Sequence, residues 1–350
     1  MPPAIEALRT RVAWSRAEGT AVVAVRGEDA RAALLHLLPS RLLLRDAQVK
    51  ESLVLTEEGR PVADVLVCAD DEDYFLLVEG MSASEVLEHA RAHLPAGLAV
   101  ELADLTPGYE VLRVDGPWAW ELVSLVLGPD LVALPYLNYF RIDQGWCVRA
   151  GKTGEYGYEL VARRETTGAL LASLAEHGAA MGLAEIDEEA LALCRFESWF
   201  FDPRYVPEDV TPVELQLQWR LDPTRSWVGS AAVEVRRASA TRRLTCLVTA
   251  KEIEAGDEVR FGARVIGRVA RAAYSQAREE WIASALLDRE HAHGGIDRYE
   301  VRGARVRTAA PPLIDNRSLY VDPRRHSFQT ADEIVFGPLW RGARAPGAGA

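Results

Sequence analysis

The sequence has few cysteines, and their spacing limits the chemistry open to the protein. Only 4 cysteines occur among 350 residues, and no two of them form a Cys-x-x-Cys pair. Neither a zinc ribbon nor a redox dithiol is therefore encoded locally, and the cysteines are interpreted as small buried hydrophobic residues. His291 and His293 lie close together in a loop-like stretch, and no metal site is predicted.

Positive charge is also scarce, since 40 lysines and arginines stand against 52 acidic residues and the formal net charge is −12. Such a charge repels nucleic acids and anionic membranes at long range, so neither is expected as a partner. No apolar run approaches the roughly 20 residues that cross a bilayer. The first residues also lack the basic-then-apolar pattern of a signal peptide, and we expect a cytoplasmic protein.

What the sequence does have is a succession of short strands and helices. Hydrophobic residues make up 49% of the chain, which is enough for two or three globular domains. Ser82 and Glu85 form a capping box that predicts a helix running to about Leu94. Apolar and alternating runs predict a helix at 28–38 and strands at 20–25, 52–56, 62–68 and 74–78.

The remaining chain falls into two regions. Residues 110–197 repeat the strand-and-helix style of the first region, although no residue-level repeat is visible. From about residue 240, short strands broken by glycines are typical of a small barrel or sandwich. We therefore predict an α+β fold that divides near residue 230, with the barrel at 231–335 and a flexible Gly/Ala/Pro-rich tail at 336–350.

One acid lies within an apolar strand. Alternation along 62–67 places the Asp64 side chain on the face shared by Val62 and Leu66. Because burying an unpaired carboxylate is costly, Asp64 is either bound to a cation or donor, or kept for function. The residues alone leave both explanations open.

Two other stretches are also open to more than one interpretation. Gly151, Gly154 and Gly157 recur at intervals of three before a strand, which permits a tight turn or close approach to a ligand. They do not form a dinucleotide fingerprint, because no strand precedes them in the required form. The aromatic run 199–201, with Tyr205 nearby, indicates either core packing or the floor of a ligand site.

Several motifs resemble those of the glycine-cleavage T-protein, or aminomethyltransferase, superfamily. The stretch GKTGEYGYEL at 151–160 is similar to its R-x-G-Y-T-G-E-x-G-x-E signature, and other motifs follow in the same order over roughly residues 12–320. Seven motifs in register are hard to obtain by chance. The other six are the turn and strand 59–64, the stretches 114–117 and 193–197, Thr211–Glu214 with Trp219, the stretch 226–229, and the barrel-strand motif formed by 267–269 and 284–286 together.

The resemblance implies a cloverleaf of three domains around a central folate channel. Two interleaved α+β units, roughly 1–50 with 140–230 and 51–139, would precede a C-terminal β-barrel. It also implies a transferase that moves a one-carbon group, methyl or aminomethyl, between a small molecule and tetrahydrofolate.

The resemblance also assigns site residues position by position. Asp64 matches the second of the family's paired aspartates, beside the reactive nitrogens of folate, and is the predicted catalytic carboxylate. Glu159 matches the carboxylate that binds the amino-pyrimidine edge of the pterin, and Arg195 matches an arginine near the pterin. An Asp64→Ala variant is then expected to fold and bind folate without turnover.

Three further positions near the expected folate depart from the family pattern. Lys152 stands where the family has a tyrosine, Gly80 where an asparagine is usual, and Glu51 where another tyrosine is usual. The segment before the first strand of the T-protein is also missing, so no lipoyl carrier protein is expected as a partner. The chain is more similar to relatives that demethylate small O-, S- or N-methyl compounds, and residues 311–319 resemble their C-terminal part.

Two alternatives stay open at this point. One is a T-protein-like enzyme that has lost folate and catalyses a different reaction, which the changes at Lys152, Gly80 and Glu51 favour. The other is a non-catalytic folate-binding protein of the iron–sulfur maintenance type. The stretch 197–202 lacks the cysteine that such proteins carry, which favours the transferase.

Overall fold

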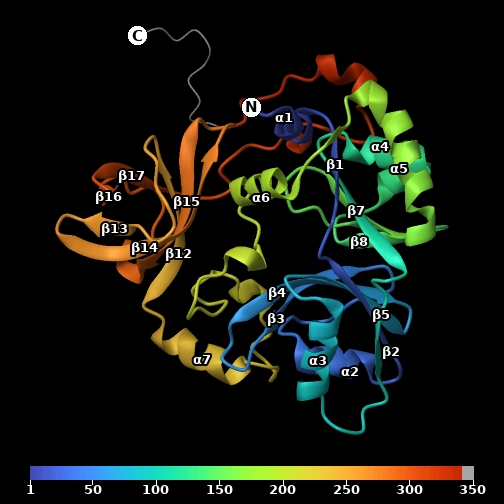
Figure 1. Cartoon of the computed structure of the whole chain (residues 1–350), viewed down its shortest axis with the longest axis horizontal. Coiled ribbons are helices and arrows are strands. Elements are labelled where there is room, and N and C mark those ends of the chain that lie inside the picture. Colours follow the sequence, from blue (N-terminus) through green and yellow to red (C-terminus); the bar gives the residue numbers. More distant parts are fainter. Residues whose placement is uncertain (341–350) are drawn as a thin grey trace.

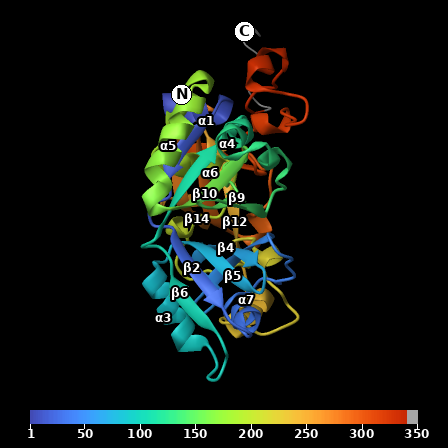
Figure 2. The same cartoon turned by 90° about the vertical axis from the view of Figure 1, so that its right-hand side faces the viewer.

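Three parts of the chain surround a common centre in the computed structural model, which describes residues 1–340 (Figure 1). Two α+β units lie one above the other, and a closed six-stranded barrel lies beside them. The turned view separates the two units and shows that the segment after the barrel returns to the upper one (Figure 2). This arrangement confirms the predicted α+β cloverleaf.

The first unit is a six-stranded sheet covered by helices. Its strand order is β11-β1-β7-β10-β9-β8, and β7 and β10 are central neighbours. The strands are β1 (Ala13–Arg16), β7 (Tyr109–Asp115), β8 (Asn138–Ile142), β9 (Gly145–Arg149), β10 (Gly157–Arg163) and β11 (Ala184–Glu185), and the helices are α1 (Pro3–Thr10), α4 (Ala119–Leu127), α5 (Arg164–Gly178) and α6 (Glu188–Glu197).

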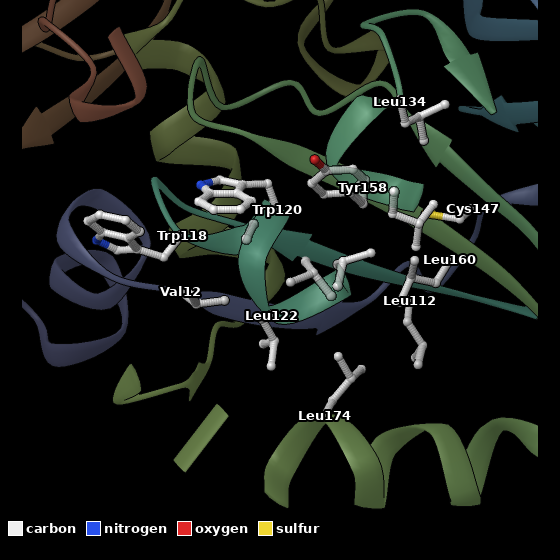
Figure 3. Packing of buried hydrophobic residues seen from close by; sticks show 14 of the residues in the cluster. Val12, Leu112, Trp118, Trp120, Leu122, Leu134, Cys147, Tyr158, Leu160 and Leu174 are labelled. Carbon is white, nitrogen blue, oxygen red and sulfur yellow. The ribbon is translucent and has the colours of Figure 1, made fainter. Parts of the chain in front are cut away.

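The core of this unit lies between the sheet and helices α4 and α5 (Figure 3). Leu112 and Leu160 contribute from neighbouring strands, Leu122 from α4 and Leu174 from α5. Each is at most 1% exposed, so burial of apolar surface holds the sheet against these two helices. The opposite face of the sheet points to the centre of the molecule.

The second unit is a five-stranded sheet with the order β3-β4-β5-β2-β6. The Ser82 side chain accepts a hydrogen bond from the Glu85 N–H, and the Glu85 carboxylate accepts one from the Ser82 N–H, so the capping box is confirmed. The elements are β2 (Ala21–Arg26), α2 (Ala30–Leu37), β3 (Val49–Leu55), β4 (Pro61–Asp70), β5 (Asp73–Glu79), α3 (Ala83–His93) and β6 (Glu101–Asp104).

The chain passes between the two units at positions that differ from those predicted from the sequence. β1 and β2 are consecutive and separated by a turn, yet they pair in different sheets. The strands at 13–16 and 109–185 therefore form one sheet and those at 21–104 the other, whereas the sequence grouped 1–50 with 140–230. Strand partners far apart in the chain decide this division, and local patterns do not report them.

The barrel closes in the order β12-β15-β14-β13-β16-β17, as the sequence predicted for this region. Helix α7 (Ser230–Ser239) leads into it, and the register shifts between Val269 and Arg271 on β14. Within residues 1–340, none of the helices combines the length and hydropathy needed to span a membrane. The strands are β12 (Arg242–Thr249), β13 (Glu258–Phe261), β14 (Arg264–Ser275), β15 (Glu280–Asp288), β16 (Tyr299–Val301) and β17 (Ala304–Ala309).

The segment after the barrel packs on the first unit. Phe328 meets Trp118 edge-on at a ring-centroid distance of 5.9 Å, and Phe336 packs against the same core. The tail predicted at 336–350 is thus held at its beginning, where Trp340 also lies 4.2 Å from the Arg278 guanidinium. Its remainder, 341–350, lies outside the described residues.

A buried arginine ties these parts together. Arg9 of α1 donates to Glu197 Oε2 at 2.7 Å, to the Thr153 carbonyl at 2.8 Å and to the Cys194 carbonyl at 2.9 Å. Ser275 of the barrel donates to the other oxygen of Glu197 at 2.6 Å. Both Arg9 and Glu197 are fully buried, so this pair joins α1, α6, the glycine-rich loop and the barrel.

Replacing Arg9 tests that connection. We expect Arg9→Met to lower the free energy of unfolding by about 3–5 kcal/mol, because it leaves the buried Glu197 carboxylate without its cation. Chemical denaturation would measure the change. In the control Arg305→Met, an exposed pair with Asp297 is lost, and the expected change is below about 1 kcal/mol. Equal losses in the two variants would contradict the proposed connection.

Candidate functional site

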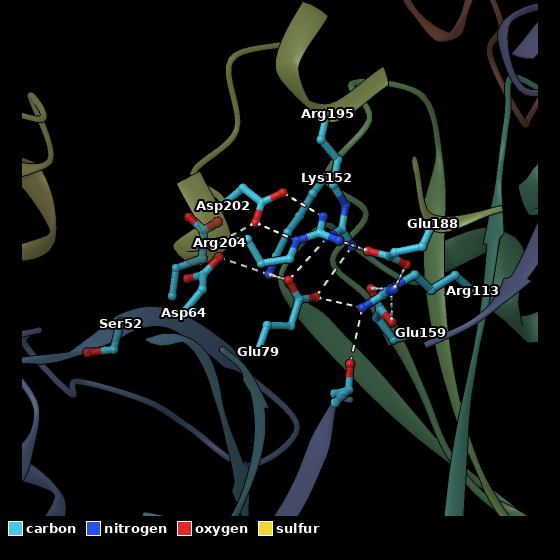
Figure 4. A network of polar contacts seen from close by, with 12 residues as sticks. Ser52, Asp64, Glu79, Arg113, Lys152, Glu159, Glu188, Arg195, Asp202 and Arg204 are labelled. Atoms are coloured by element: carbon cyan, nitrogen blue, oxygen red, sulfur yellow. Dashed lines mark hydrogen bonds and ion pairs between the residues drawn. The ribbon is translucent and has the colours of Figure 1, made fainter. Parts of the chain in front are cut away.

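Eight charged side chains meet between the two sheets, and Figure 4 labels all of them except Glu51 and Arg220. We call these residues, four anions and four cations, the central ion-pair network. They come from both sheets, from α6 and from two loops. They are Glu51, Asp64, Glu79, Glu159, Arg113, Lys152, Arg195 and Arg220.

Asp64 lies between two cations in this network. Its side chain is 1% exposed, Lys152 Nζ lies 2.8 Å from Oδ2, and Arg220 Nη1 donates to Oδ1 at 2.6 Å. Arg220 also donates to Glu51 Oε1 at 3.2 Å. The structural explanation for an acid within an apolar strand is therefore present, because Asp64 is buried and paired.

Glu79 connects the two halves of the network. It lies directly opposite Asp64 on the neighbouring strand, where two like charges would destabilise the sheet. Lys152 Nζ, 3.3 Å from Glu79 Oε2, bridges the two acids. Burial opposes ionisation of Glu79, but the charges of Arg195, Lys152 and Arg113 outweigh it and hold its pKa well below the usual range.

Glu159 is paired within its own sheet. It stands opposite Arg113 on the neighbouring strand, and Arg113 Nε donates to both of its carboxylate oxygens at 3.2 Å. Arg113 also donates to Glu79 at 2.7 Å and to the Thr20 hydroxyl at 3.1 Å. One guanidinium thus links Glu159 to the second sheet.

The glycine-rich loop brings Lys152 into the network. A Cβ built on Gly151 would lie 2.4 Å from the Gly157 Cα, so the two arms of the loop touch backbone to backbone. Glycine permits this approach because it has no Cβ. The loop is therefore a tight turn that places Lys152, 3% exposed, toward Asp64.

Asp115 is a buried acid beside the network. Thr153 Oγ1 donates to its Oδ1 at 2.9 Å. Burial and, secondarily, the negative charge of Glu159 raise the pKa of Asp115 to about 6. Asp115 therefore ionises in a pH range, near 6, in which most carboxylates are already ionised.

A cavity of about 410 Å³ opens on one side of the network, and we call it the aromatic cavity. Glu51 and Arg220 belong to its wall, whereas Asp64 reaches it only through Arg220. The aromatic run predicted either for the core or for a ligand site belongs to this wall. Its aromatic residues are Phe196, Trp199, Phe200, Phe201, Tyr205 and Trp219.

A second cavity of about 560 Å³ lies against the other predicted residues. Gly80 and Arg195 line it, together with Arg113 and Glu79. A side chain at Gly80 would meet the Val62 carbonyl at 2.7 Å and Pro203 at 2.8 Å, so glycine is required there by packing. Asp202 lines both cavities.

The structure thus brings all six predicted site residues to one region but divides them. Glu51 lines the aromatic cavity, and Gly80 and Arg195 line the second one. Of the four cavities described in residues 1–340, none is lined by any of Asp64, Lys152 and Glu159.

Sequence reasoning missed Arg113, Glu79 and Arg220. Arg113 lies among the apolar residues of β7. A charged residue within a buried strand needs a partner, so Arg113 could have been found in the same way as Asp64. Glu79 ends a strand and Arg220 lies in a short turn of 3-10 helix, where charged residues are ordinary. No local signal marks either of them.

Two family models match nearly the whole chain. The model described as "GCVT N-terminal domain" matches residues 4–225, and "Glycine cleavage T-protein C-terminal barrel domain" matches residues 242–315. The chain belongs to the glycine cleavage T-protein family. The predicted resemblance is thereby confirmed for both the α+β region and the barrel.

Relatives named aminomethyltransferase match most of the chain. That of Rubrobacter xylanophilus is 30% identical over 248 residues, 68% of this chain and 65% of the relative. That of a Geobacillus species is 27% identical over 321 residues, 86% of each. Mitochondrial dimethylglycine dehydrogenase of Mus musculus is 26% identical over 282 residues, 75% of this chain but only 32% of the relative.

A solved structure supports the fold. The crystal structure of glycine cleavage system aminomethyltransferase T from Bartonella henselae superposes with a TM-score of 0.80 at 20% identity, covering 90% of this chain and 89% of the other. At this identity the likeness establishes the cloverleaf architecture and nothing finer.

The acids that the resemblance assigns to tetrahydrofolate are paired with protein cations in this structure. Both Glu159 oxygens, which the resemblance assigns to the pterin edge, accept from Arg113 Nε. The resemblance also places Asp64 beside the coenzyme, and Lys152 Nζ lies 2.8 Å from its Oδ2. The coenzyme could reach these acids only if Lys152 and Arg113 released them.

Replacing Asp64 tests how far the network depends on it. We expect Asp64→Asn to lower the free energy of unfolding by about 3–5 kcal/mol, since two buried cations, Lys152 and Arg220, each lose one of their two charged partners. This differs from the expectation drawn from the sequence, in which an Asp64 variant kept its stability. The matched control Asp46→Asn removes an exposed partner of Arg141 and should cost below about 1 kcal/mol in the same denaturation experiment.

Asp115 generates a prediction about pH. Its folded pKa is raised from 3.8 to about 6, so the native state holds this proton more tightly and stability falls as pH rises through that window. Asp115→Asn removes the effect. The stability of the variant relative to the original should therefore rise by roughly 1.4 kcal/mol between pH 5 and pH 7.5. A pH-independent difference would refute the raised pKa.

Proposed function

We propose that this chain is a one-carbon transferase that demethylates a small O-, S- or N-methyl compound bound in the aromatic cavity, with tetrahydrofolate as acceptor. Family membership across both regions supports the transfer of a one-carbon group. The relative named dimethylglycine dehydrogenase supports a methylated donor. A free small molecule, rather than a lipoyl carrier protein, is the proposed donor.

The observation that carries this proposal is a cavity walled by six aromatic residues with an ion-paired guanidinium at one side. Aromatic walls bury an apolar or methylated ligand and exclude water. When a methyl group moves from an ether or thioether to an N–H nucleophile, the bonding electron pair stays on the oxygen or sulfur, which takes up the proton that the nucleophile loses. Arg220 can stabilise that developing negative charge, because a pre-oriented cation in a dry site needs no reorganisation.

In this proposal Asp64 acts through Arg220. Its Oδ1 accepts from Arg220 Nη1 at 2.6 Å, and Glu51 accepts from the other terminal nitrogen. Two acceptors fix the plane and direction of the guanidinium. Asp64 is therefore a positioning residue, and Arg220 is the residue that contacts the donor.

Tetrahydrofolate is the acceptor that family membership supports. Glu159, Arg195, Gly80 and Lys152 stay the proposed coenzyme contacts, on the condition that the coenzyme takes the places that Arg113 and Lys152 now hold beside Glu159 and Asp64. The same closed arrangement favours a second candidate function, a T-protein-like enzyme whose reaction in the aromatic cavity uses no folate.

Direct titration separates the two candidates. With tetrahydrofolate, calorimetry should give a micromolar Kd, and incubation with small O-, S- and N-methyl compounds should yield methyltetrahydrofolate detectable by mass spectrometry. Absence of tetrahydrofolate binding would reject the first candidate in favour of the second. Binding without turnover of any methylated compound would instead indicate the non-catalytic alternative.

Arg220→Lys tests the role of the guanidinium in turnover. The variant keeps the positive charge but loses the planar fork, so we expect kcat to fall about 10-fold or more with a smaller change in KM. Arg41→Lys is the control, because Arg41 is exposed and paired with Asp222 outside both cavities. An unchanged kcat in Arg220→Lys would show that the fork does not act on the reacting group.

A further inference from the structure

The aromatic cavity contains a cation that no acid neutralises. Arg271 lies in its wall, and none of the ion pairs described for residues 1–340 involves its guanidinium. By contrast, Arg220 in the same wall is bound to Glu51 and Asp64. Of the two acids in the wall, Glu51 is thus engaged, and Asp202 is bound by Arg204 at 2.6 Å.

The guanidinium of Arg271 lies close to two aromatic rings. Its central carbon lies 3.6 Å from the Tyr205 ring centroid and 4.3 Å from that of Phe196. One terminal nitrogen donates to the Ala192 carbonyl at 3.1 Å, and within the described residues this is its one hydrogen bond. An arginine has five N–H donors in one plane, so donors remain along the edge of a guanidinium whose face is covered.

The backbone of the barrel places Arg271 toward the cavity. The register of β14 against β15 shifts between Val269 and Arg271, so that Val269 stands opposite Ala285 and Arg271 opposite Ser284. Val269 packs into the barrel core, whereas Arg271 and Ser284 both line the cavity. A β-bulge changes which side chains face a site, and this one turns a cation out of the barrel.

Leaving this cation unpaired is costly, and the structure shows the cost. Burial lowers the pKa of Arg271, and the opposing effects of Tyr205 and Asp202 do not compensate. A ligand anion at this position would supply the missing partner. A carboxylate matches the fork of a guanidinium by two parallel hydrogen bonds, and flat aromatic walls favour a planar ligand body.

We propose that Arg271 anchors a planar ring carboxylate in the aromatic cavity, so that the methylated substrate is an aromatic acid rather than a neutral or cationic amine. The assignment of this ligand as the substrate rests on the proposed function, but its binding does not. The carboxylate lies at the Arg271 side and the ring extends along the aromatic wall toward Arg220.

Two probes of equal shape test the anion requirement without any variant. We expect 2-naphthoate to bind the full chain at least 10-fold more tightly than its neutral counterpart 2-naphthamide, measured by calorimetry. Equal affinities, or no binding of 2-naphthoate at millimolar concentration, would overturn the proposal. If 2-naphthoate binds tightly but no methylated compound transfers a one-carbon group to tetrahydrofolate, the anion site at Arg271 stands, and the proposed function is rejected together with the substrate assignment.

Variants locate the anion. Arg271→Gln should weaken 2-naphthoate binding at least 10-fold and change 2-naphthamide binding less than 2-fold, while Arg271→Lys should retain part of the preference. Arg264→Gln, on the same strand but exposed and paired with Asp288 and Glu290, should leave both affinities unchanged. A preference for 2-naphthoate that survives in Arg271→Gln would overturn the assignment.

A third probe distinguishes an aromatic acid from the folate tail, whose carboxylates lie on the glutamate attached to its ring. 4-Aminobenzoylglutamate carries the ring and carboxylates of the folate tail. One outcome is that this probe binds the original chain at least 10-fold more tightly than 2-naphthoate and loses that advantage in Arg271→Gln. In that case Arg271 binds the coenzyme, and the substrate assignment is overturned. Weaker binding of this probe supports an aromatic acid as the substrate.

Discussion

The structure depends on the neutralisation of buried charge at the place where three parts of the chain meet. Asp64 and Glu79 are opposed on adjacent strands, and one ammonium group, Lys152 Nζ, lies between them. Removing a charge from water costs several kcal/mol unless a partner of opposite sign lies close to it. The chain meets that requirement by pairing side chains from both sheets, α6 and two loops, so the network also fixes how these parts pack.

The same network determines where a ligand can bind. Because Arg113 engages Glu159 and Lys152 engages Asp64, the acids at the centre are not surfaces of an open channel. The space that remains lies on either side, in the aromatic cavity and in the second cavity lined by Gly80 and Arg195.

The barrel contributes more to the site than its place at the end of the chain suggests. The bulge in β14 turns Arg271 toward the aromatic cavity, and Ser275 of the same strand binds Glu197, which Arg9 also holds. Strand β14 of the barrel therefore binds the barrel to α6 through Ser275 and also places the Arg271 cation in the aromatic cavity. This arrangement makes the aromatic cavity a site shared between regions.

The sequence by itself determined the elements, the family and the neighbourhood of the site. The capping box at Ser82, the alternation around Asp64 and the glycines near Lys152 are local patterns, and local patterns report local structure. Only the tertiary structure decided that β1 and β2 enter different sheets and that Arg113 and Lys152 occupy the acids predicted to face the coenzyme. Pairing between residues distant in sequence depends on how the sheets pack, and no spacing along the chain encodes it.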